Sequence, residues 1–355
     1  MADKLDLLGM SLEQLTEYVK GLGQSAFRAK QIYQWLCRGV DFEGMSNLPA
    51  ALRAQLEQNC VANPVSVERA LVSNLDGTEK YLYRVRDGNL IEGVLMRYHH
   101  GNTLCLSTQV GCAMGCAFCA STLEGCVRDL TSGEMLGQII CANRRLAQEQ
   151  EGGRVGNVVL MGSGEPLDNY DNVVNFLRLA TDERGLNLSI RGISLSTCGL
   201  VERMRRFAQE GLGVTLSLSL HAPNDEIRQR LMPVARAYSI DAVIDACRYY
   251  VEKTGRRVIF EYALIRDVNC EPAHADELAR RLRGLQCHVN LIPLNDVPER
   301  NLRAPEPRQI EAFMERLRAK HISVTRRREM GDDIEGACGQ LRRHALSEDD
   351  KARGQ

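Results

Sequence analysis

The sequence has little of three features that mark other classes of protein. Aromatic residues make up only 5% of its 355 residues, with a single tryptophan, and the formal net charge is −1. Without an excess of basic residues the chain has no overall attraction for nucleic acid, so any RNA site must be a local basic patch. No apolar run approaches the roughly 20 residues that a membrane-spanning helix needs, and we expect no membrane contact.

The start of the sequence also lacks the pattern of a secretion signal. It reads Met-Ala-Asp-Lys-Leu-Asp, without the apolar stretch that follows the basic region of a signal peptide. We therefore expect a cytoplasmic protein. The thirteen cysteines would suggest a disulfide framework only in a short secreted chain, and in a reducing compartment they favour metal-binding or catalytic thiols.

Three of the cysteines, Cys112, Cys116 and Cys119, have the spacing C-x3-C-x2-C. Thiolates are soft ligands that select iron–sulfur clusters, zinc or Cu(I). Three thiolates can hold three irons of a cubane cluster, which normally takes four cysteine ligands. The fourth iron would then be open for chemistry.

Two other interpretations of these thiols stay open. They could form a structural zinc site with Cys105 or Cys126 as the fourth ligand. They could also be core residues on one face of an amphipathic helix. Gly111 and Gly115 argue against that helix, because each glycine costs a helix about 1 kcal/mol relative to alanine.

From residue 103 onward, short apolar runs rich in β-branched residues alternate with segments of helical periodicity. The predicted strands are 104–108, 158–161, 193–197, 214–220, 258–264, 289–292 and 322–325. Strands separated by helices predict parallel pairing through βαβ units. Six or seven units are too few for an eightfold barrel, so we expect an α/β fold with an open, partial (βα)6-type TIM barrel.

The chain before this point divides into two further segments. Residues 1–62 are predicted to form a helical accessory domain, in which Ser11 and Gln14 resemble a capping box. Residues 63–100 alternate like strands and are expected to form a strand-rich connecting extension. The barrel with a C-terminal cysteine loop is assigned to 101–346, and a frayed tail to 347–355.

The cysteine spacing, with Phe118 before the last thiol, resembles the radical S-adenosylmethionine (radical SAM) superfamily, which has a partial barrel of this kind. Further motifs, over residues from about 5 to 345, narrow the resemblance to the RlmN family of RNA adenine methyltransferases. They are Cys105-Leu-Ser-Thr-Gln-Val-Gly-Cys112, Cys119-Ala-Ser-Thr, Met161-Gly-Ser-Gly-Glu-Pro-Leu, Ser219-Leu-His221-Ala-Pro-Asn, Asn290-Leu-Ile-Pro-Leu-Asn295 and the segment around Cys338. The helical segment resembles the accessory domain of that family.

The resemblance implies a methyl transfer in two stages. One S-adenosylmethionine methylates the Cys338 thiolate, and a second yields a 5′-deoxyadenosyl radical that removes hydrogen from this methyl group. The methylene radical adds to carbon 2 of an adenine. Glu92 matches the family's proposed proton acceptor, and attack by Cys105 on the Cys338 sulfur releases methyladenine and leaves a disulfide.

The same resemblance assigns residues to the cofactors. A [4Fe–4S] cluster would be held by Cys112, Cys116 and Cys119. The contacts to S-adenosylmethionine would come from polar groups and turns near the ends of the predicted strands: Gly164, Glu165, Ser196, Ser219, Leu220, His221 and Asn295.

The resemblance also implies the partners of the protein. The substrates would be an adenosine of 23S rRNA in the peptidyl-transferase centre and the adenosine next to the anticodon in some tRNAs. An external electron donor, flavodoxin-like or similar, would serve the cluster, and we expect a monomer. The candidate RNA contacts are basic residues and one aromatic residue: Arg28, Lys30, Trp35, Arg203, Arg205, Arg206, Arg326, Arg327, Arg328, Arg342 and Arg343.

Two other functions compete with this one. A Cfr-type enzyme would methylate carbon 8 of the same rRNA adenosine, but the helical domain and the Gly164-Glu165-Pro166 turn favour the carbon-2 enzyme. A zinc-bearing RNA-binding protein without catalysis would need neither Cys105 nor Cys338.

Overall fold

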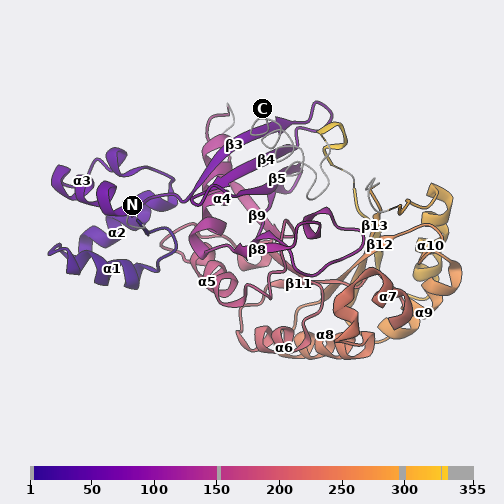
Figure 1. Ribbon diagram of the computed structural model, residues 1–355. Coiled ribbons are helices and arrows are strands. Elements are labelled where there is room, and N and C mark those ends of the chain that lie inside the picture. Colours follow the sequence, from indigo (N-terminus) through magenta and orange to yellow (C-terminus); the bar gives the residue numbers. More distant parts are fainter. Residues whose placement is uncertain (1–3, 150–152, 296–300, 329, 335–355) are drawn as a thin grey trace.

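The computed structural model describes residues 4–149, 153–295, 301–328 and 330–334. A small helical module lies beside a larger body, in which helices pack around the outside of one twisted sheet (Figure 1). Cys338 and the predicted tail fall outside the described residues. None of the helices in the described ranges is long and apolar enough to cross a membrane.

The helical module contains α1 (Leu12–Gly21), α2 (Ala26–Cys37) and α3 (Ala50–Asn59). The short strands β1 (Leu5–Asp6) and β2 (Cys60–Val61) pair in parallel and close the module. The capping box predicted at the start of α1 is confirmed, because the Gln14 backbone N–H donates to Ser11 Oγ and the Ser11 N–H donates to Gln14 Oε1.

Within the described residues the central sheet has ten strands, and their order across the sheet is their order in the sequence. The strands are β3 (Val65–Val72), β4 (Glu79–Val85), β5 (Leu90–Tyr98), β6 (Gly101–Cys105), β9 (Val155–Leu160), β10 (Ile193–Thr197), β11 (Thr215–Ser219), β12 (Val258–Leu264), β13 (Cys287–Pro293) and β14 (Val324–Arg326). The seven strands from β6 to β14 pair in parallel.

Helices follow six of the parallel strands and cover the outer face of the sheet (Figure 1). They are α4 (Ser132–Leu146), α5 (Tyr170–Thr181), α6 (Val201–Gln209), α7 (Asp225–Leu231), α8 (Ile240–Thr254), α9 (Pro272–Leu282) and α10 (Pro307–Ala319). Apolar, β-branched strands buried between helices and the barrel interior explain this arrangement. The predicted open, partial barrel is confirmed.

The strands of the segment 63–100 extend the same sheet. β3, β4 and β5 form an antiparallel meander whose last strand pairs with β6. β6 is therefore bordered by an antiparallel neighbour on one side and by the parallel strand β9 on the other. This makes the segment an edge of the barrel sheet rather than a bridge to it.

A two-stranded ribbon follows β6. It consists of β7 (Gln109–Gly111) and β8 (Cys126–Asp129), and the segment between them carries the three closely spaced cysteines. Gly111 and Gly115 adopt φ values of 79° and 67°, which suit glycine and do not occur in a right-handed helix. The core-helix interpretation of the thiols is therefore wrong.

The helical module and the barrel share one hydrophobic core, to which both Leu36 and Ile140 belong. Polar contacts add to it, since Tyr33 Oη donates to Asp182 and Arg184 pairs with Glu13 at 2.7 Å. The module is thus packed onto the barrel on its α4–α5 side.

Candidate active site

A cavity of about 510 Å³ opens where the parallel strands end, the edge at which barrels of this type build their sites. Ten of the predicted site residues line it: Cys105, Cys112, Cys116, Cys119, Gly164, Glu165, Ser196, Ser219, His221 and Asn295. The sequence motifs thus converge on one place, although they are spread over nearly 200 residues.

Three predicted site residues do not line the cavity among the described residues. Leu220 is fully buried, and its backbone carbonyl accepts a hydrogen bond from Arg228 Nε. Glu92 is buried in β5, on the strand face that Val94 and Met96 present to the cavity. Cys338 lies outside the described residues.

The cysteine segment is held by backbone hydrogen bonds. The Cys112 N–H donates to the Gly125 carbonyl at 2.9 Å, and the Ala117 N–H donates to Leu231 of α7 at 2.8 Å. Burial raises the pKa of the Cys112 thiol to about 12, with a contribution from the neighbouring Cys119. Such closely spaced buried thiols favour protonation unless a metal centre takes them up as thiolates.

Glu165 is fixed at the back of the cavity by its surroundings. Its carboxylate accepts the N–H groups of Cys198 at 2.7 Å and Leu167 at 3.0 Å, while its own N–H donates to Gln109 Oε1. Burial raises the pKa of the Glu165 carboxyl, and the N–H donors oppose this. A carboxylate in such a place suits a cationic amino group.

His221 is a neutral imidazole in a strained backbone position. Its φ is 54°, which is uncommon for a residue other than glycine. Burial lowers its pKa to about 3, and Nδ1 accepts the N–H of Ala263 at 2.8 Å. The remaining proton is therefore on Nε2, and the ring packs edge-to-face against Phe118 at 4.7 Å.

Cys105 and Glu92 are neighbours through the sheet. Cys105 pairs with Val94 of β5 in the strand register, two residues beyond Glu92. The carboxylate of Glu92 lies 4.0 Å from Nζ of Lys80 on β4, and both side chains are buried. A thiol on β6 and a carboxylate on β5 thus share one face of the sheet.

Sequence reasoning missed three charged residues at this site. Lys80 is 1% exposed, Arg228 is fully buried and Glu261 lines the cavity. The guanidinium of Arg228 donates to the carbonyls of Cys198 and Leu220, which holds the ends of β10 and β11 together. The sequence signal that could have found such a residue is a charged side chain inside an otherwise apolar run, as for Glu261 in the run 258–264.

Five of the predicted basic candidates fall into two groups, whereas Arg342 and Arg343 lie outside the described residues. Arg327 and Arg328 line the cavity. Arg203 and Arg206 instead lie over the ring of Tyr170, at 5.7 and 3.9 Å, and Arg205 lies over that of Tyr249. The first role of these three arginines of α6 is therefore to pack on tyrosine rings of the helices α5 and α8.

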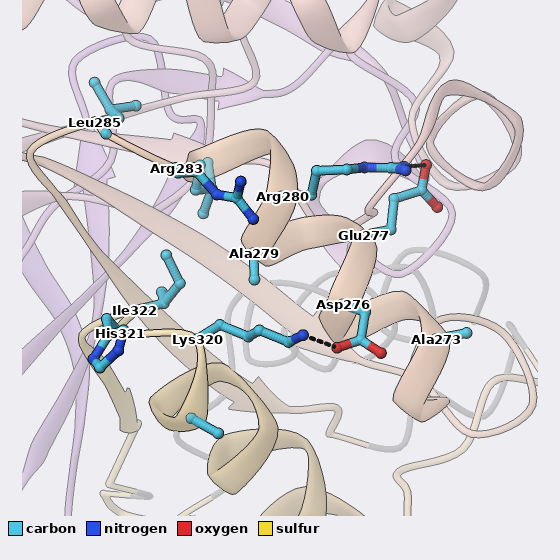
Figure 2. A pocket seen from close by; sticks show the side chains of 13 residues that line it. Ala273, Asp276, Glu277, Ala279, Arg280, Arg283, Leu285, Lys320, His321 and Ile322 are labelled. Atoms are coloured by element: carbon cyan, nitrogen blue, oxygen red, sulfur yellow. Dashed lines mark ion pairs between the residues drawn. The ribbon is translucent and has the colours of Figure 1, made fainter.

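A larger hollow, of about 980 Å³, lies between α9 and the end of α10 (Figure 2). Its charged side chains pair with each other, as Arg280 does with Glu277 at 3.6 Å and Lys320 with Asp276 at 3.4 Å. It adjoins Leu285 and Ile322, which precede β13 and β14. It is thus at the opposite end of the strands from the cavity and holds none of the predicted site residues.

Comparison with known proteins covers almost the whole chain. Residues 106–279 match the Radical SAM superfamily, and residues 5–62 match the ribosomal RNA large subunit methyltransferase N-terminal domain. The chain is 52% identical to a probable dual-specificity RNA methyltransferase RlmN of Alkaliphilus oremlandii, over 97% of this chain and 99% of that protein. The chain belongs to the RlmN family.

Other RlmN relatives and one solved structure agree with this assignment. The identity to a probable dual-specificity RNA methyltransferase RlmN of Clostridium tetani is 48%, over 99% of both chains. The crystal structure of a radical SAM methyltransferase from Sphaerobacter thermophilus superposes with a TM-score of 0.91 at 45% identity, covering 95% of this chain and 98% of that one.

Membership of the radical SAM superfamily implies a [4Fe–4S] cluster and S-adenosylmethionine, and the cavity fits both. Within the described ranges no three Cys, His, Asp or Glu side chains are arranged as ligands of a single metal ion. The three thiols instead stand around one cavity, as ligands of separate irons in a cubane do. Glu165, the strand-end serines, His221 and Asn295 offer hydrogen-bonding groups beside them.

Proposed function

We propose that this protein methylates carbon 2 of adenosine in RNA through an S-methylated Cys338. The observation that carries the proposal is that Cys105, on β6, lines the same cavity as Cys112, Cys116 and Cys119. A radical transfer through a second cysteine requires, beside the cluster site, a thiol that is not itself a ligand of the cluster.

The cofactors are proposed to bind within this cavity. Cys112, Cys116 and Cys119 hold the cluster, and Gly164, Glu165, Ser196, Ser219, His221 and Asn295 surround S-adenosylmethionine. Leu220, which is buried, links Ser219 to His221 in this set. When bound, these cofactors supply a methyl cation equivalent and a carbon radical, so two molecules of S-adenosylmethionine are used per turnover. The burial of the site keeps water from the radical.

The protein side chains carry the remaining steps. The Cys338 thiolate takes up the methyl group, whose carbon later bonds to carbon 2 of the adenine. Glu92 receives the proton that leaves carbon 2. The radical formed on the adenine gives up one electron with this proton, which the cluster, when bound, would take back. The Cys105 thiolate then attacks the Cys338 sulfur, the electron pair of the broken carbon–sulfur bond stays on the methylene carbon, and a proton converts that carbon to the methyl group of the product. An external reductant reduces the resulting disulfide and restores the thiols.

The proposed substrates are 23S rRNA and tRNA, because the relatives bear the name dual-specificity RNA methyltransferase. The adenine must leave its stack to enter the cavity. Arg327 and Arg328 line that cavity and are suited to phosphate groups beside the flipped base. A flavodoxin-like electron donor and a monomeric enzyme complete the proposal.

The test is nucleoside mass spectrometry after reaction of the anaerobically reconstituted enzyme with tRNA and with an rRNA fragment. We expect 2-methyladenosine from wild type, no product and no adduct from Cys338→Ala, and a stable protein–RNA adduct from Cys105→Ala. Cys247→Ala, at a fully buried core thiol, is the matched control and should turn over. Formation of 8-methyladenosine alone would contradict the proposal and indicate the Cfr-type reaction.

A further inference from the structure

Lys80 is a lysine buried in the wall of the site, where lysine is rarely found. It lies on β4, the strand next to the edge strand β3, yet only 1% of its side chain is exposed. Its Nζ is 4.0 Å from Oε1 of Glu92, whose side chain is 8% exposed. The sheet has therefore placed an ammonium group beside a carboxylate, away from bulk water.

The strand register places this pair on the side of the sheet that faces the cavity. Lys80 pairs with Val94 and Leu82 pairs with Glu92, so the four residues share one face of the β4–β5 ladder. Val94 lines the cavity and also pairs with Cys105 of β6. Lys80, Glu92 and Cys105 thus follow one another across three adjacent strands.

The chemistry of a proton acceptor gives the pair a purpose. A carboxyl group taken out of water favours its protonated form, and a protonated carboxyl cannot accept another proton. A cation within about 4 Å favours the ionised form. A bound RNA would exclude more water from Glu92, which increases the need for such a cation.

We propose that Lys80 is a positioning residue that holds the carboxylate of Glu92 through their ion pair and orients it to take the proton from the adenine carbon. The inference rests on the role proposed above for Glu92. Lys80 touches neither cofactor nor substrate in this scheme. It acts only on the step in which the covalent RNA adduct is resolved, and not on methylation of Cys338.

The chain offers a matched control on the other face of the same strands. Arg97 of β5 pairs at 2.5 Å with Glu79 of β4, which is 1% exposed, and Arg97 also pairs with Glu149. Glu79 and Arg97 point away from the cavity, because each is one residue out of step with the Lys80 face. In both pairs the carboxylate is buried, so a purely structural role for a cation beside a buried carboxylate would apply to both.

The experiment measures single steps in anaerobic, reconstituted Lys80→Met, Lys80→Arg, Glu92→Gln and Arg97→Met proteins with a tRNA substrate. Mass spectrometry gives the methylated fraction of Cys338, and denaturing gels give the amount and lifetime of the adduct. We expect Lys80→Met to methylate Cys338 as wild type does, yet to resolve the adduct about tenfold or more slowly, within the range that proton-transfer groups contribute. Lys80→Arg should restore most of the rate, and Arg97→Met should lower thermal stability without prolonging the adduct.

The outcomes separate the inference from the function on which it rests. If Glu92→Gln turns over normally, the proton-acceptor role of Glu92 is wrong. If Glu92→Gln traps the adduct while Lys80→Met resolves it within twofold of wild type, the role of Lys80 alone is wrong. If Lys80→Met and Arg97→Met slow resolution of the adduct equally, the role of Lys80 is also wrong. If Lys80→Met does not fold, Lys80→Gln replaces it under the same criteria.

Discussion

Gly164 shows how little space single residues have at the cavity. Its φ is 110°, and a Cβ atom there would lie 2.7 Å from the backbone nitrogen of Gln109 and from Thr108 Oγ1. Only glycine fits this conformation and this approach without strain. The backbone turn at Gly164 therefore sets the position of the Glu165 backbone.

Gly164→Ala should therefore weaken binding of S-adenosylmethionine at least tenfold and cost about 1–3 kcal/mol of stability, the usual price of a strained backbone. Equilibrium dialysis with labelled S-adenosylmethionine and urea unfolding measure the two effects. Gly21→Ala is the control, since a Cβ atom there meets nothing within 4 Å. Wild-type binding by Gly164→Ala would show that the turn tolerates a side chain.

Replacement of the thiols tests the metal centre residue by residue. Cys112→Ala, Cys116→Ala or Cys119→Ala should each lower the iron content after reconstitution to a small fraction of that of wild type, because a cubane needs three protein thiolates. Cys126→Ala should retain iron, although Cys126 is near enough to Cys112 to affect the pKa of its thiol. Loss of metal from Cys126→Ala, with zinc bound in wild type, would favour the structural zinc site instead.

Single residues also mark the limit of prediction from sequence. The ligand-type residues could be predicted because their motifs are local and specific, and most of them line the cavity. Lys80 could not, because a lysine in an alternating strand ordinarily faces water. Its burial follows only from the pairing of β4 with β5 and β6, which is a tertiary property.

Among the secondary structure elements, α4 begins at the contact between the helical module and the barrel. Thr131 and Glu134 form its capping box. The carboxylate of Asp6, from β1, lies so close to Gly133 that any side chain at that position would overlap it. The start of one barrel helix is thus shaped to accept a side chain from the module.

This contact predicts a pH dependence of stability. Burial raises the pKa of Asp6 from 3.8 to about 6. The folded state then binds the proton more tightly than the unfolded chain, so this residue lowers stability increasingly as the pH rises from about 4 to about 6, by roughly 1–3 kcal/mol.

Asp6→Asn should remove that loss of stability. The free energy of unfolding of Asp6→Asn, relative to that of wild type, should therefore increase as the pH rises over the same interval. Urea unfolding of the cluster-free protein at pH 4.5 and at pH 7 measures the difference. The exposed residue Asp245 provides the control variant, Asp245→Asn. A difference between Asp6→Asn and wild type that does not change with pH would refute the assignment.

The parallel strands of the barrel were easier to predict from the sequence than the place of the neighbouring meander β3–β5. The runs 193–197 and 258–264 coincide with β10 and β12, because buried parallel strands are short, apolar and β-branched. The meander β3–β5 was predicted as strands but not as part of the barrel sheet. Its attachment depends on the pairing of β5 with β6, which alternation alone does not specify.

For the molecule as a whole, we propose that the helical module and the cavity divide the work of binding RNA. Arg28 and Trp35 are partly engaged in holding Asn47, through its backbone carbonyl and its side-chain oxygen. Phe27 is 64% exposed and Lys30 is exposed on the same helix. An exposed aromatic ring near basic groups suits unpaired bases and phosphates.

Lys30→Glu should therefore weaken RNA binding several-fold and reduce its salt dependence, without changing cleavage of S-adenosylmethionine in the absence of RNA. Filter binding at several salt concentrations measures both quantities. Arg283→Glu, in the hollow at the far end of the barrel (Figure 2), is the charge-matched control. Equal losses in the two variants would mean that binding responds to net charge and not to the module.

The agreement between strand order and sequence order has a consequence for how the chain assembles during synthesis. Each strand of the central sheet joins the edge left by the strand of that sheet before it, so the sheet can grow in one direction as residues emerge. The meander forms first through short turns and provides a template for β6. Arg327 and Arg328, which follow β14, also line the cavity, so the nascent protein acquires its complete cofactor-binding pocket only after the last strand of the sheet has emerged.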